Sequence, residues 1–232
     1  MFDHSYPVLP LTHLVSDCDG VLIDSEAVAL DAMLTALQSR MADREQLAAL
    51  IRPRLGLPLV EVLAQLFAIL EATPAAGELV AIGEYIEHEC DRRLSLVPGV
   101  ADALAAIALP KAVASNSHSD RVRAALARTG LAPLFGTHIH TPDNSGLPKP
   151  DPAVYLAAAA GLGVAPGHCI AVEDSITGAT AAVAAGMVVL GYIGGGHVPA
   201  GQALRMQALG VHATFDTMSA LPGLVSTLTL RR

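Results

Sequence analysis

Acidic residues gather at two points of a sequence that is otherwise rich in apolar residues. Asp17 and Asp19 follow a short apolar run in LVSDCDGVLIDSE. Glu173 and Asp174 follow another apolar run in CIAVEDS. Converging carboxylates repel one another unless a cation lies among them, and oxygen-only ligands suit Mg²⁺, which also keeps water and binds substrate phosphate. Asp17, Glu173 and Asp174 therefore predict a magnesium site.

Polar residues that suit a phosphate group occur at two further points. Ser115 and Asn116 end the run KAVASNS just before a predicted helix, where a hydroxyl and backbone amides can hold phosphate oxygens. Lys149 stands between prolines in PKPDP, and the chain has only one other lysine, Lys111, which indicates that the compact ammonium group of Lys149 is required. A metal, an anion cradle, a lysine and a spare carboxylate are the parts that phosphoryl transfer needs.

Each feature also has a structural interpretation. An Asp pair before glycine is common in turns, and acids such as Glu173 and Asp174 are favoured at helix starts. Ser115 can be a helix cap, and Lys149 an exposed loop residue. We favour catalysis because all four features occur together.

The elements that must position these residues are strands of one sheet. Short β-branched runs alternate with alanine-rich helical segments, which is typical of a parallel sheet covered on both faces. Ligands of a doubly wound sheet bind at the carboxyl ends of its strands, where the polar residues above occur. The strands are expected at 14–16, 111–115, 138–141, 169–172, 187–193 and about 212–215.

One interval is too long for a simple crossover. Nearly a hundred residues separate Asp17 from Ser115, whereas a parallel crossover needs only about a dozen. The surplus, 25–96, is rich in Ala, Leu, Glu and Arg, with apolar residues at helical spacing. We predict an α/β fold, a Rossmann-like doubly wound parallel sheet formed by 1–24 and 97–232, with an α-helical domain inserted at 25–96. Ser25 and its acidic neighbours are expected to start the first inserted helix.

Composition excludes several classes of function. The net charge is −8, aromatic residues make up 3%, and no Lys/Arg run is present, so nucleic acid is not an expected partner. The uncharged stretch 175–204 contains seven glycines and one proline, which argues against a membrane span. Three scattered cysteines and a first segment without a basic region predict a cytoplasmic protein. We expect a monomer or weak dimer.

The motif order DxDGVLxDSE, SNS, KPDP and VEDSxxG resembles the haloacid dehalogenase superfamily of phosphohydrolases. It is most similar to the branch that holds phosphoglycolate phosphatases, β-phosphoglucomutases and 6-phosphogluconate phosphatases. The resemblance extends from about Leu14 to Gly196. It implies that the inserted helical domain is a cap that closes over the active site.

The resemblance assigns catalytic and metal-binding roles. It implies that Asp17 is the nucleophile and forms an aspartyl phosphate. Asp19 would protonate the leaving oxygen and then activate water. Asp17, Asp174 and the backbone carbonyl of Asp19 would bind Mg²⁺. Glu173 would either bind the metal directly or contact the residues that bind it.

The resemblance also assigns phosphate-binding roles. Ser115 and Asn116 would bind the transferring phosphoryl group, and Lys149 would stabilise its charge and orient the nucleophile. A carboxylate two residues after the nucleophile implies an alkoxide leaving group. The expected function is a Mg²⁺-dependent phosphatase of a small phosphorylated metabolite, a sugar or sugar-acid phosphate.

Two alternatives remain open. β-Phosphoglucomutases carry a cap histidine where this chain has Ala29, and an arginine three residues after the glycine that matches Gly56, where this chain has Leu59. Arg52 and Arg54 lie nearby in sequence and can substitute, and together with 88–91 they are candidates to contact the substrate. The second alternative is a module that binds phosphate and metal without turnover.

Overall fold

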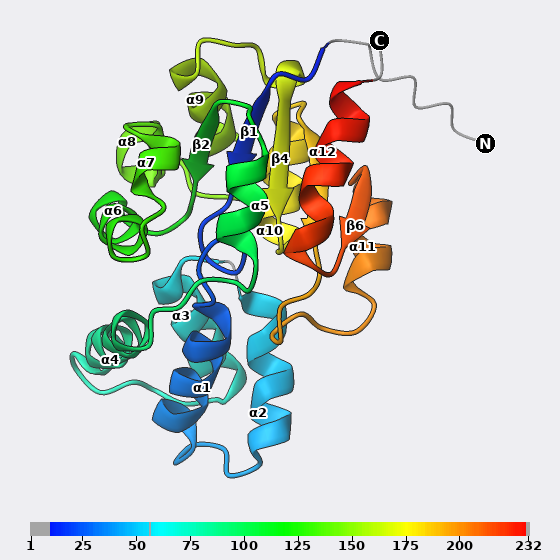
Figure 1. Ribbon diagram of the computed structural model, residues 1–232. Coiled ribbons are helices and arrows are strands. Elements are labelled where there is room, and N and C mark those ends of the chain that lie inside the picture. Colours follow the sequence, from blue (N-terminus) through cyan, green and yellow to red (C-terminus); the bar gives the residue numbers. More distant parts are fainter. Residues whose placement is uncertain (1–9, 56, 231–232) are drawn as a thin grey trace.

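The computed structural model describes residues 10–55 and 57–230 (Figure 1). Gly56 lies outside the described residues. So does 1–9, which makes up most of the first segment from which a cytoplasmic protein was predicted. Six parallel strands form one sheet in the order β3-β2-β1-β4-β5-β6, which is that of a doubly wound sheet. The strands are β1 His13–Ser16, β2 Lys111–Ala114, β3 Ile139–His140, β4 Cys169–Glu173, β5 Val188–Tyr192 and β6 Ala213–Phe215.

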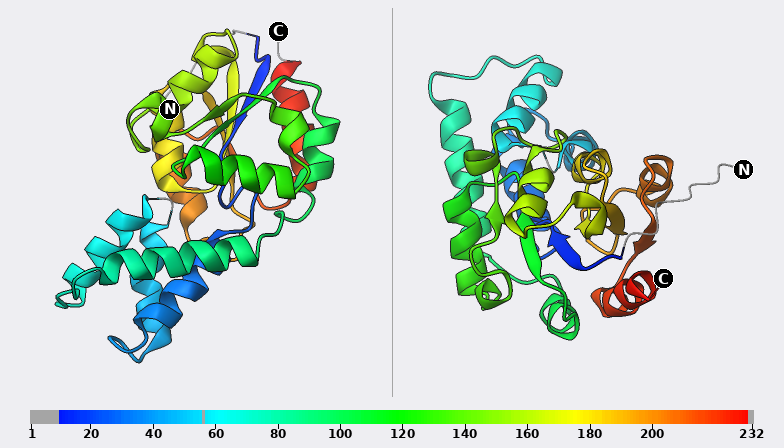
Figure 2. Two further views of the ribbon diagram at one scale, coloured as in Figure 1. Left: turned by 90° about the vertical axis from the view of Figure 1, so that its left-hand side faces the viewer. Right: turned by 90° about the horizontal axis from the view of Figure 1, so that it is seen from above.

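Helices cover both faces of this sheet (Figures 1 and 2). Successive strand residues point to opposite faces, so Leu14 of β1 packs in one apolar cluster and Val15 in the other. The first cluster includes α5, α6 and α12, and the second includes α9, α10 and α11. The helices are α5 Val100–Ala106, α6 Ser119–Arg128, α7 Ala132–Phe135, α8 Pro142–Ser145, α9 Ala153–Gly161, α10 Ile176–Ala184, α11 Gln202–Ala208 and α12 Leu221–Thr229. The predicted fold class is confirmed.

A second body of helices lies between β1 and β2 in the chain and beyond the carboxyl ends of the strands (Figure 1). It has its own apolar cluster, drawn from residues between Val28 and Cys90. Its helices are α1 Glu26–Leu37, α2 Arg44–Ile51, α3 Leu59–Ile69 and α4 Glu78–Arg92. We call this body the cap; its boundaries at 25 and 96 stay a prediction.

Two connecting segments join the cap to the sheet. The backbone N–H of Asp24 donates to the carbonyl of Ser95 at 2.9 Å, and that of Val97 donates to Leu22 at 3.0 Å. The outgoing and returning chains are therefore paired at the point where the cap begins. Among the described residues, no helix is both long and apolar enough to cross a membrane.

The strand order fixes where the polar residues meet. β1 lies between β2 and β4, so the residues that follow these three strands emerge side by side. Asp17 follows β1, Ser115 follows β2 and Asp174 follows β4. All three residues lie just beyond the carboxyl ends of their strands, on the side of the sheet where the cap lies.

Candidate active site

Lys149 lies at the centre of a buried ion cluster. Its Nζ is 2.8 Å from Asp17 Oδ1 and 2.6 Å from Glu173 Oε1, and its side chain is 3% exposed. Burial opposes a charged lysine, but the two carboxylates outweigh it and raise the pKa of Lys149 above its ordinary value. The loop lysine between prolines is therefore a buried ammonium ion directed at Asp17 and Glu173.

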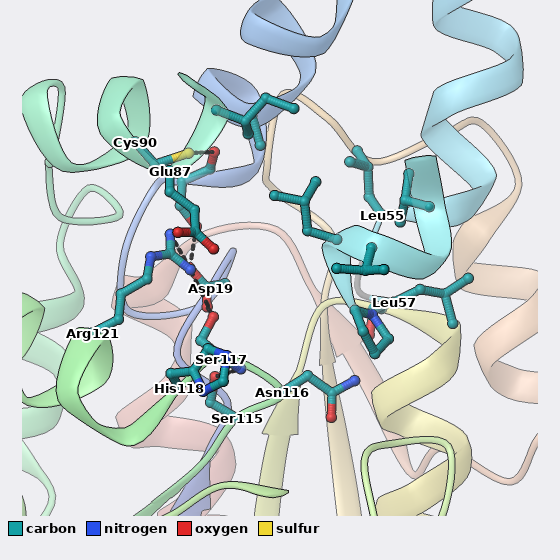
Figure 3. A pocket seen from close by; sticks show the side chains of 18 of the residues that line it. Asp19, Leu55, Leu57, Glu87, Cys90, Ser115, Asn116, Ser117, His118 and Arg121 are labelled. Atoms are coloured by element: carbon teal, nitrogen blue, oxygen red, sulfur yellow. Dashed lines mark hydrogen bonds and ion pairs between the residues drawn. The ribbon is translucent and has the colours of Figure 1, made fainter. Parts of the chain in front are cut away.

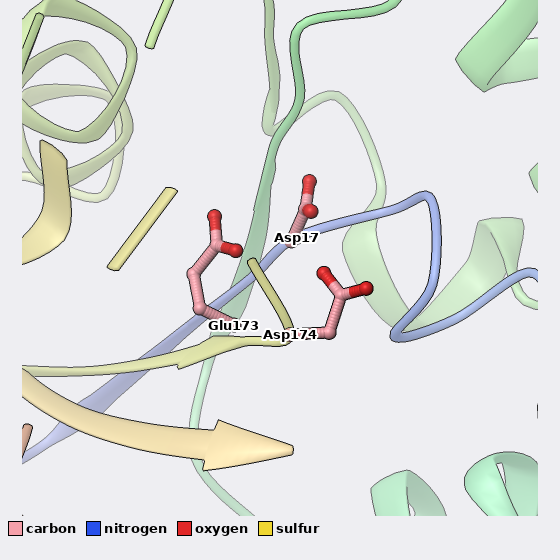
Figure 4. Close-up of side chains that lie close together, drawn as sticks. All are labelled: Asp17, Glu173 and Asp174. Carbon is pink, nitrogen blue, oxygen red and sulfur yellow. The ribbon is translucent and has the colours of Figure 1, made fainter. Parts of the chain in front are cut away.

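Three carboxylates surround one point next to this ammonium (Figure 4). Oxygen atoms of Asp17, Glu173 and Asp174 all lie within 4.8 Å of one another. Burial, followed by repulsion from Glu173, raises the pKa of both Asp17 and Asp174. One ammonium group does not balance three carboxylates, and a divalent cation would supply the missing charge. The donor set, oxygen only and convergent, fits Mg²⁺.

Two glycines make room for these acids. Gly20 has φ +82°, and a Cβ added there would overlap the carboxylate of Asp174. A Cβ added at Gly178, inside α10, would overlap the carboxylate of Glu173. The glycines in DxDG and VEDSxxG are thus required by the close approach of the acidic side chains.

Asp19 has partners of its own, two hydroxyl groups and a guanidinium, and Figure 3 shows Ser117 and Arg121 beside it. Ser25 Oγ donates to its Oδ1 at 2.5 Å and Ser117 Oγ to its Oδ2 at 2.7 Å, while Arg121 Nη2 lies 3.4 Å from Oδ1. Burial acts to raise the pKa of Asp19, but Arg121 and the two hydroxyls outweigh burial and lower that pKa. Asp17 and Asp19, two residues apart, therefore have different charged partners, Lys149 for Asp17 and Arg121 for Asp19.

Ser25 has a different role from the one expected. It precedes α1, as predicted, but its side chain makes no capping bond to that helix. The hydroxyl donates to Asp19 instead. A residue at the start of the cap thus contacts a carboxylate in the loop that follows β1.

Ser115 and Asn116 both line the cavity next to Lys149. The hydroxyl of Ser115 accepts a bond from the backbone N–H of Ser117 at 3.0 Å. The Asn116 side chain accepts from the backbone N–H of Lys149 at 2.7 Å and donates to its carbonyl at 3.2 Å. Asn116 therefore holds the lysine loop in place, and the phosphate-binding roles of both residues stay predictions.

Glu173 is fully buried, with both oxygens bound by protein groups. Its Oε1 accepts from Lys149 at 2.6 Å and from the Tyr155 hydroxyl at 2.5 Å. Its Oε2 accepts from the Ser175 hydroxyl at 3.2 Å. These contacts leave Glu173 better placed to orient Lys149 than to bind a metal directly.

Several residues of the site were not predicted from the sequence. Arg121 lies four residues after Ser117, and this helical spacing could have predicted the contact between their side chains. His197 Nε2 lies 2.7 Å from Asp174 Oδ2, and the side chain of Gln202 donates to the Asp174 carbonyl. The three glycines before His197 predict only a flexible loop. No local sequence pattern indicates that His197 contacts Asp174.

A cavity of about 300 Å³ lies between cap and core. The core lines it with polar residues, including Asp17, Asp19, Ser115, Arg121 and Lys149. The cap lines it mainly with apolar side chains, among them Met33, Leu55, Leu57, Leu59, Val60 and Ile86.

The cap arginines expected to contact substrate point elsewhere. Arg52 Nη1 lies 3.3 Å from the carbonyls of Gly196 and His197, and Arg54 Nη1 donates to the Leu50 carbonyl at 2.6 Å. Neither is among the residues that line the cavity, and of 88–91 only Cys90 is. The structure thus brings the predicted core residues together, and of the predicted cap residues it brings only Cys90 to the cavity.

Known proteins resemble this chain over most of its length. A family model described as haloacid dehalogenase-like hydrolase matches residues 11–186. The 6-phosphogluconate phosphatase of Escherichia coli strain K12 is 28% identical over 176 residues, covering 75% of this chain and 78% of that protein. Hexitol phosphatase B of the same strain is 33% identical over 183 residues, covering 75% of this chain and 79% of that protein.

A solved structure resembles the whole chain. The HAD family hydrolase from Deinococcus radiodurans R1, with bound phosphate and sodium, is 29% identical with a TM-score of 0.77, and the match covers 96% of this chain and 98% of that chain. The family model includes every strand-end residue described above, from Asp17 to Asp174. The protein is a phosphoric monoester hydrolase, and the chain belongs to the haloacid dehalogenase-like hydrolase family.

Proposed function

We propose that this enzyme is a Mg²⁺-dependent phosphatase that hydrolyses a small phosphorylated metabolite through an aspartyl phosphate on Asp17. The observation that carries the proposal is the pair Asp17 and Asp19, which line one cavity but have different partners. One carboxylate lies against a buried ammonium, and the other lies among hydroxyls and a guanidinium. Such a difference suits a nucleophile and an acid–base residue.

In the first half-reaction Asp17 attacks phosphorus and the bond from phosphorus to the leaving oxygen breaks. Lys149 and the backbone N–H of Cys18, at 2.8 and 2.7 Å, both bind Asp17 Oδ1 and fix the orientation of its carboxylate. Asp19 gives its proton to the leaving oxygen, which departs as an alcohol. A phosphate dianion beside Asp19 raises its pKa and so favours the protonated form that this step needs.

In the second half-reaction Asp19, now ionised, takes a proton from water. The resulting hydroxide attacks the phosphorus of the aspartyl phosphate, and the bond to Asp17 breaks to give inorganic phosphate. Arg121, Ser25 and Ser117 lower the pKa of Asp19 and so favour the ionised form. Water is thus activated by the group that has just protonated the alcohol.

The remaining residues bind and position. Asp17, Asp174 and the Asp19 carbonyl would hold Mg²⁺, which when bound offsets the charge of the carboxylates and the phosphoryl group. Glu173 orients Lys149 from behind the ligands. Ser115 and the backbone amides near Asn116 bind phosphate oxygens.

The substrate is a metabolite of sugar-phosphate size. A cavity of about 300 Å³ is at the small end of the range for ligand sites. The names of two relatives, a 6-phosphogluconate phosphatase and a hexitol phosphatase, support a substrate of this size. The cap, which we place at 25–96, would exclude water during attack and contact the alcohol part of the substrate.

The mutase alternative has less support. A mutase must hold a second phosphate in the cap, and the two positions that distinguish mutases, Ala29 and Leu59, place apolar side chains in the cavity. Incubation with β-glucose 1-phosphate separates the two activities. We expect phosphate release to exceed isomer formation, and faster isomerisation would reverse this assignment.

Phosphate release from phenyl phosphate in the presence of Mg²⁺ tests the phosphatase assignment. We expect release by the wild type, its loss when the metal is chelated, and a fall on the order of 10⁴-fold in Asp17→Asn. Release that is absent from the wild type, or equal in Asp17→Asn, would contradict the assignment and favour a binding module without turnover.

A further inference from the structure

The cap half of the cavity contains no cationic side chain among the described residues. Apart from its apolar residues, the cap contributes Ser25, Glu87 and Cys90 to the lining. Ser25 is already bonded to Asp19, and Glu87 is the one acidic residue. Leu55 and Leu57 lie across the cavity from Asp19 and Arg121 (Figure 3). This half thus offers apolar surface and a single negative charge.

The cap does have cations, but they are bound elsewhere. Residues 25–96 include six arginines and no lysine. None of the six lines the cavity, and each has a partner outside it. The partners are Glu78 for Arg40, Asp31 for Arg44 and Arg93, Glu89 for Arg92, the carbonyls of Gly196 and His197 for Arg52, and the Leu50 carbonyl for Arg54.

The basic residues on the core side have acidic partners. Lys149 pairs with Asp17 and Glu173, and Arg121 lies 3.4 Å from Asp19. His118, which also lines the cavity, lies 3.1 Å from Asp143. A second anionic group on a substrate would therefore find no cation that is not already paired.

We propose that the substrates are phosphate esters of uncharged alcohols whose carbon surface packs against the cap, and that Glu87 disfavours alcohols that carry a second anion. This inference rests on the proposed phosphatase function and narrows its substrate class. A carboxylate or second phosphate under the cap would lose water without gaining a cation, and Glu87 would repel it. Apolar carbon gains from burial against the leucines. Sugar acids are thus excluded from the expected class.

Two substrates of equal length test the charge preference. Glucitol 6-phosphate and 6-phosphogluconate share an open six-carbon chain and differ at C1, which is a hydroxymethyl group in one and a carboxylate in the other. We expect kcat/KM for 6-phosphogluconate to be lower by about tenfold or more at low salt. The difference should shrink as salt screens Glu87. Equal or faster turnover of 6-phosphogluconate would overturn the inference.

Two aryl esters test the apolar contact. Phenyl phosphate and 4-methylphenyl phosphate differ by one methyl group, which would lie against the cap. We expect kcat/KM to rise by about twofold to fourfold with the methyl group, the effect of burying one such group in part. A fall would show that the cap half does not accept carbon surface.

Glu87→Gln tests the residue itself, with Glu84→Gln as its control. Both acids are exposed on α4 three residues apart, but only Glu87 lines the cavity. We expect Glu87→Gln to raise the ratio of kcat/KM for 6-phosphogluconate over glucitol 6-phosphate by about threefold to fivefold, with no change in Glu84→Gln. An unchanged ratio in both variants, or the same change in both, would overturn the role of Glu87.

The two proposals fail in different ways. If no ester is hydrolysed in a manner that depends on Asp17, the phosphatase function is wrong, and this inference with it. If the esters are hydrolysed but anionic and neutral alcohols react equally, only the substrate class is wrong.

Discussion

The two halves of the cavity differ in what they contain and in how far the sequence reveals them. In the core half every charged side chain faces a group of opposite charge, as Lys149 does with Asp17 and Arg121 with Asp19. In the cap half apolar side chains surround a single acid, Glu87. From this comparison we infer that the core half performs the reaction and that the cap half selects the alcohol. The predictions below alter one half while the other serves as reference.

Replacing Lys149 should have the largest effect. Lys149→Met leaves Asp17 and Glu173 buried without their cation, so we expect kcat to fall by about 10²–10³-fold and the protein to lose roughly 3–5 kcal/mol of stability. Phosphate release and thermal unfolding measure the two effects. The other lysine is the control. Lys111 Nζ donates to the carbonyl of Leu109, far from the site chemistry, so Lys111→Met should keep its kcat. Equal losses in both variants would show that Lys149 is only structural.

Gly178→Ala tests the packing around the acid cluster. Alanine normally stabilises a helix interior relative to glycine by up to about 1 kcal/mol. At Gly178 the added Cβ would displace Glu173, so we expect a loss of about 1–3 kcal/mol and weaker Mg²⁺ binding by calorimetry. Gly223 is also in a helix, α12, and has nothing within 4 Å of an added Cβ, so Gly223→Ala should be neutral or stabilising. A stabilised Gly178→Ala would contradict the crowded geometry.

Arg121→Met should change the pH dependence of the reaction. The guanidinium lowers the pKa of Asp19, so its removal raises that pKa. Water activation needs ionised Asp19, and the acid limb of the kcat profile should therefore move to higher pH, by about one unit. Arg123, exposed on the same helix and 3.6 Å from Asp120, supplies the control variant Arg123→Met, whose profile should not move. A shift to lower pH in Arg121→Met would refute this coupling.

Leu59→Arg should have the smallest effect and would make the cap half resemble the core half. It adds a cation to a lining that has none. We expect the ratio of kcat/KM for 6-phosphogluconate over glucitol 6-phosphate to rise by about threefold to tenfold, since the added charge attracts the carboxylate. Leu59→Met keeps an apolar side chain and should leave the ratio near the wild-type value. No difference between the two variants would mean that this position lies outside the reach of the alcohol.

Much of the core was predictable because its chemistry restricts residue type and position. Asp17, Ser115 and Asp174 each follow a strand, and the apolar runs that predict those strands are local in sequence. Since the carboxyl ends of parallel strands share one edge of a sheet, strand order alone brings the three residues together. The surplus of residues between the first two strands likewise predicted the inserted helices.

The cap half was not predictable in the same way. Leu55, Leu57 and Val60 have the spacing of ordinary helix and loop residues, and an apolar side chain that faces a cavity looks in sequence like one that faces a core. Arg52 and Arg54 were natural candidates for substrate contact because of their charge. Both instead contact backbone carbonyls.

The sequence by itself determined the family, because its carboxylates, its lysine and its two glycines occur in the order of that family's motifs. The tertiary structure decided how those groups are tuned. The bond from Ser117 to Asp19 joins residues 98 positions apart, and the contact of His197 with Asp174 spans 23. The tertiary structure also decided that the cap arginines face away from the cavity. Such pairings depend on how helices and loops pack across the molecule, and packing is the sum of many weak contacts that no short motif records.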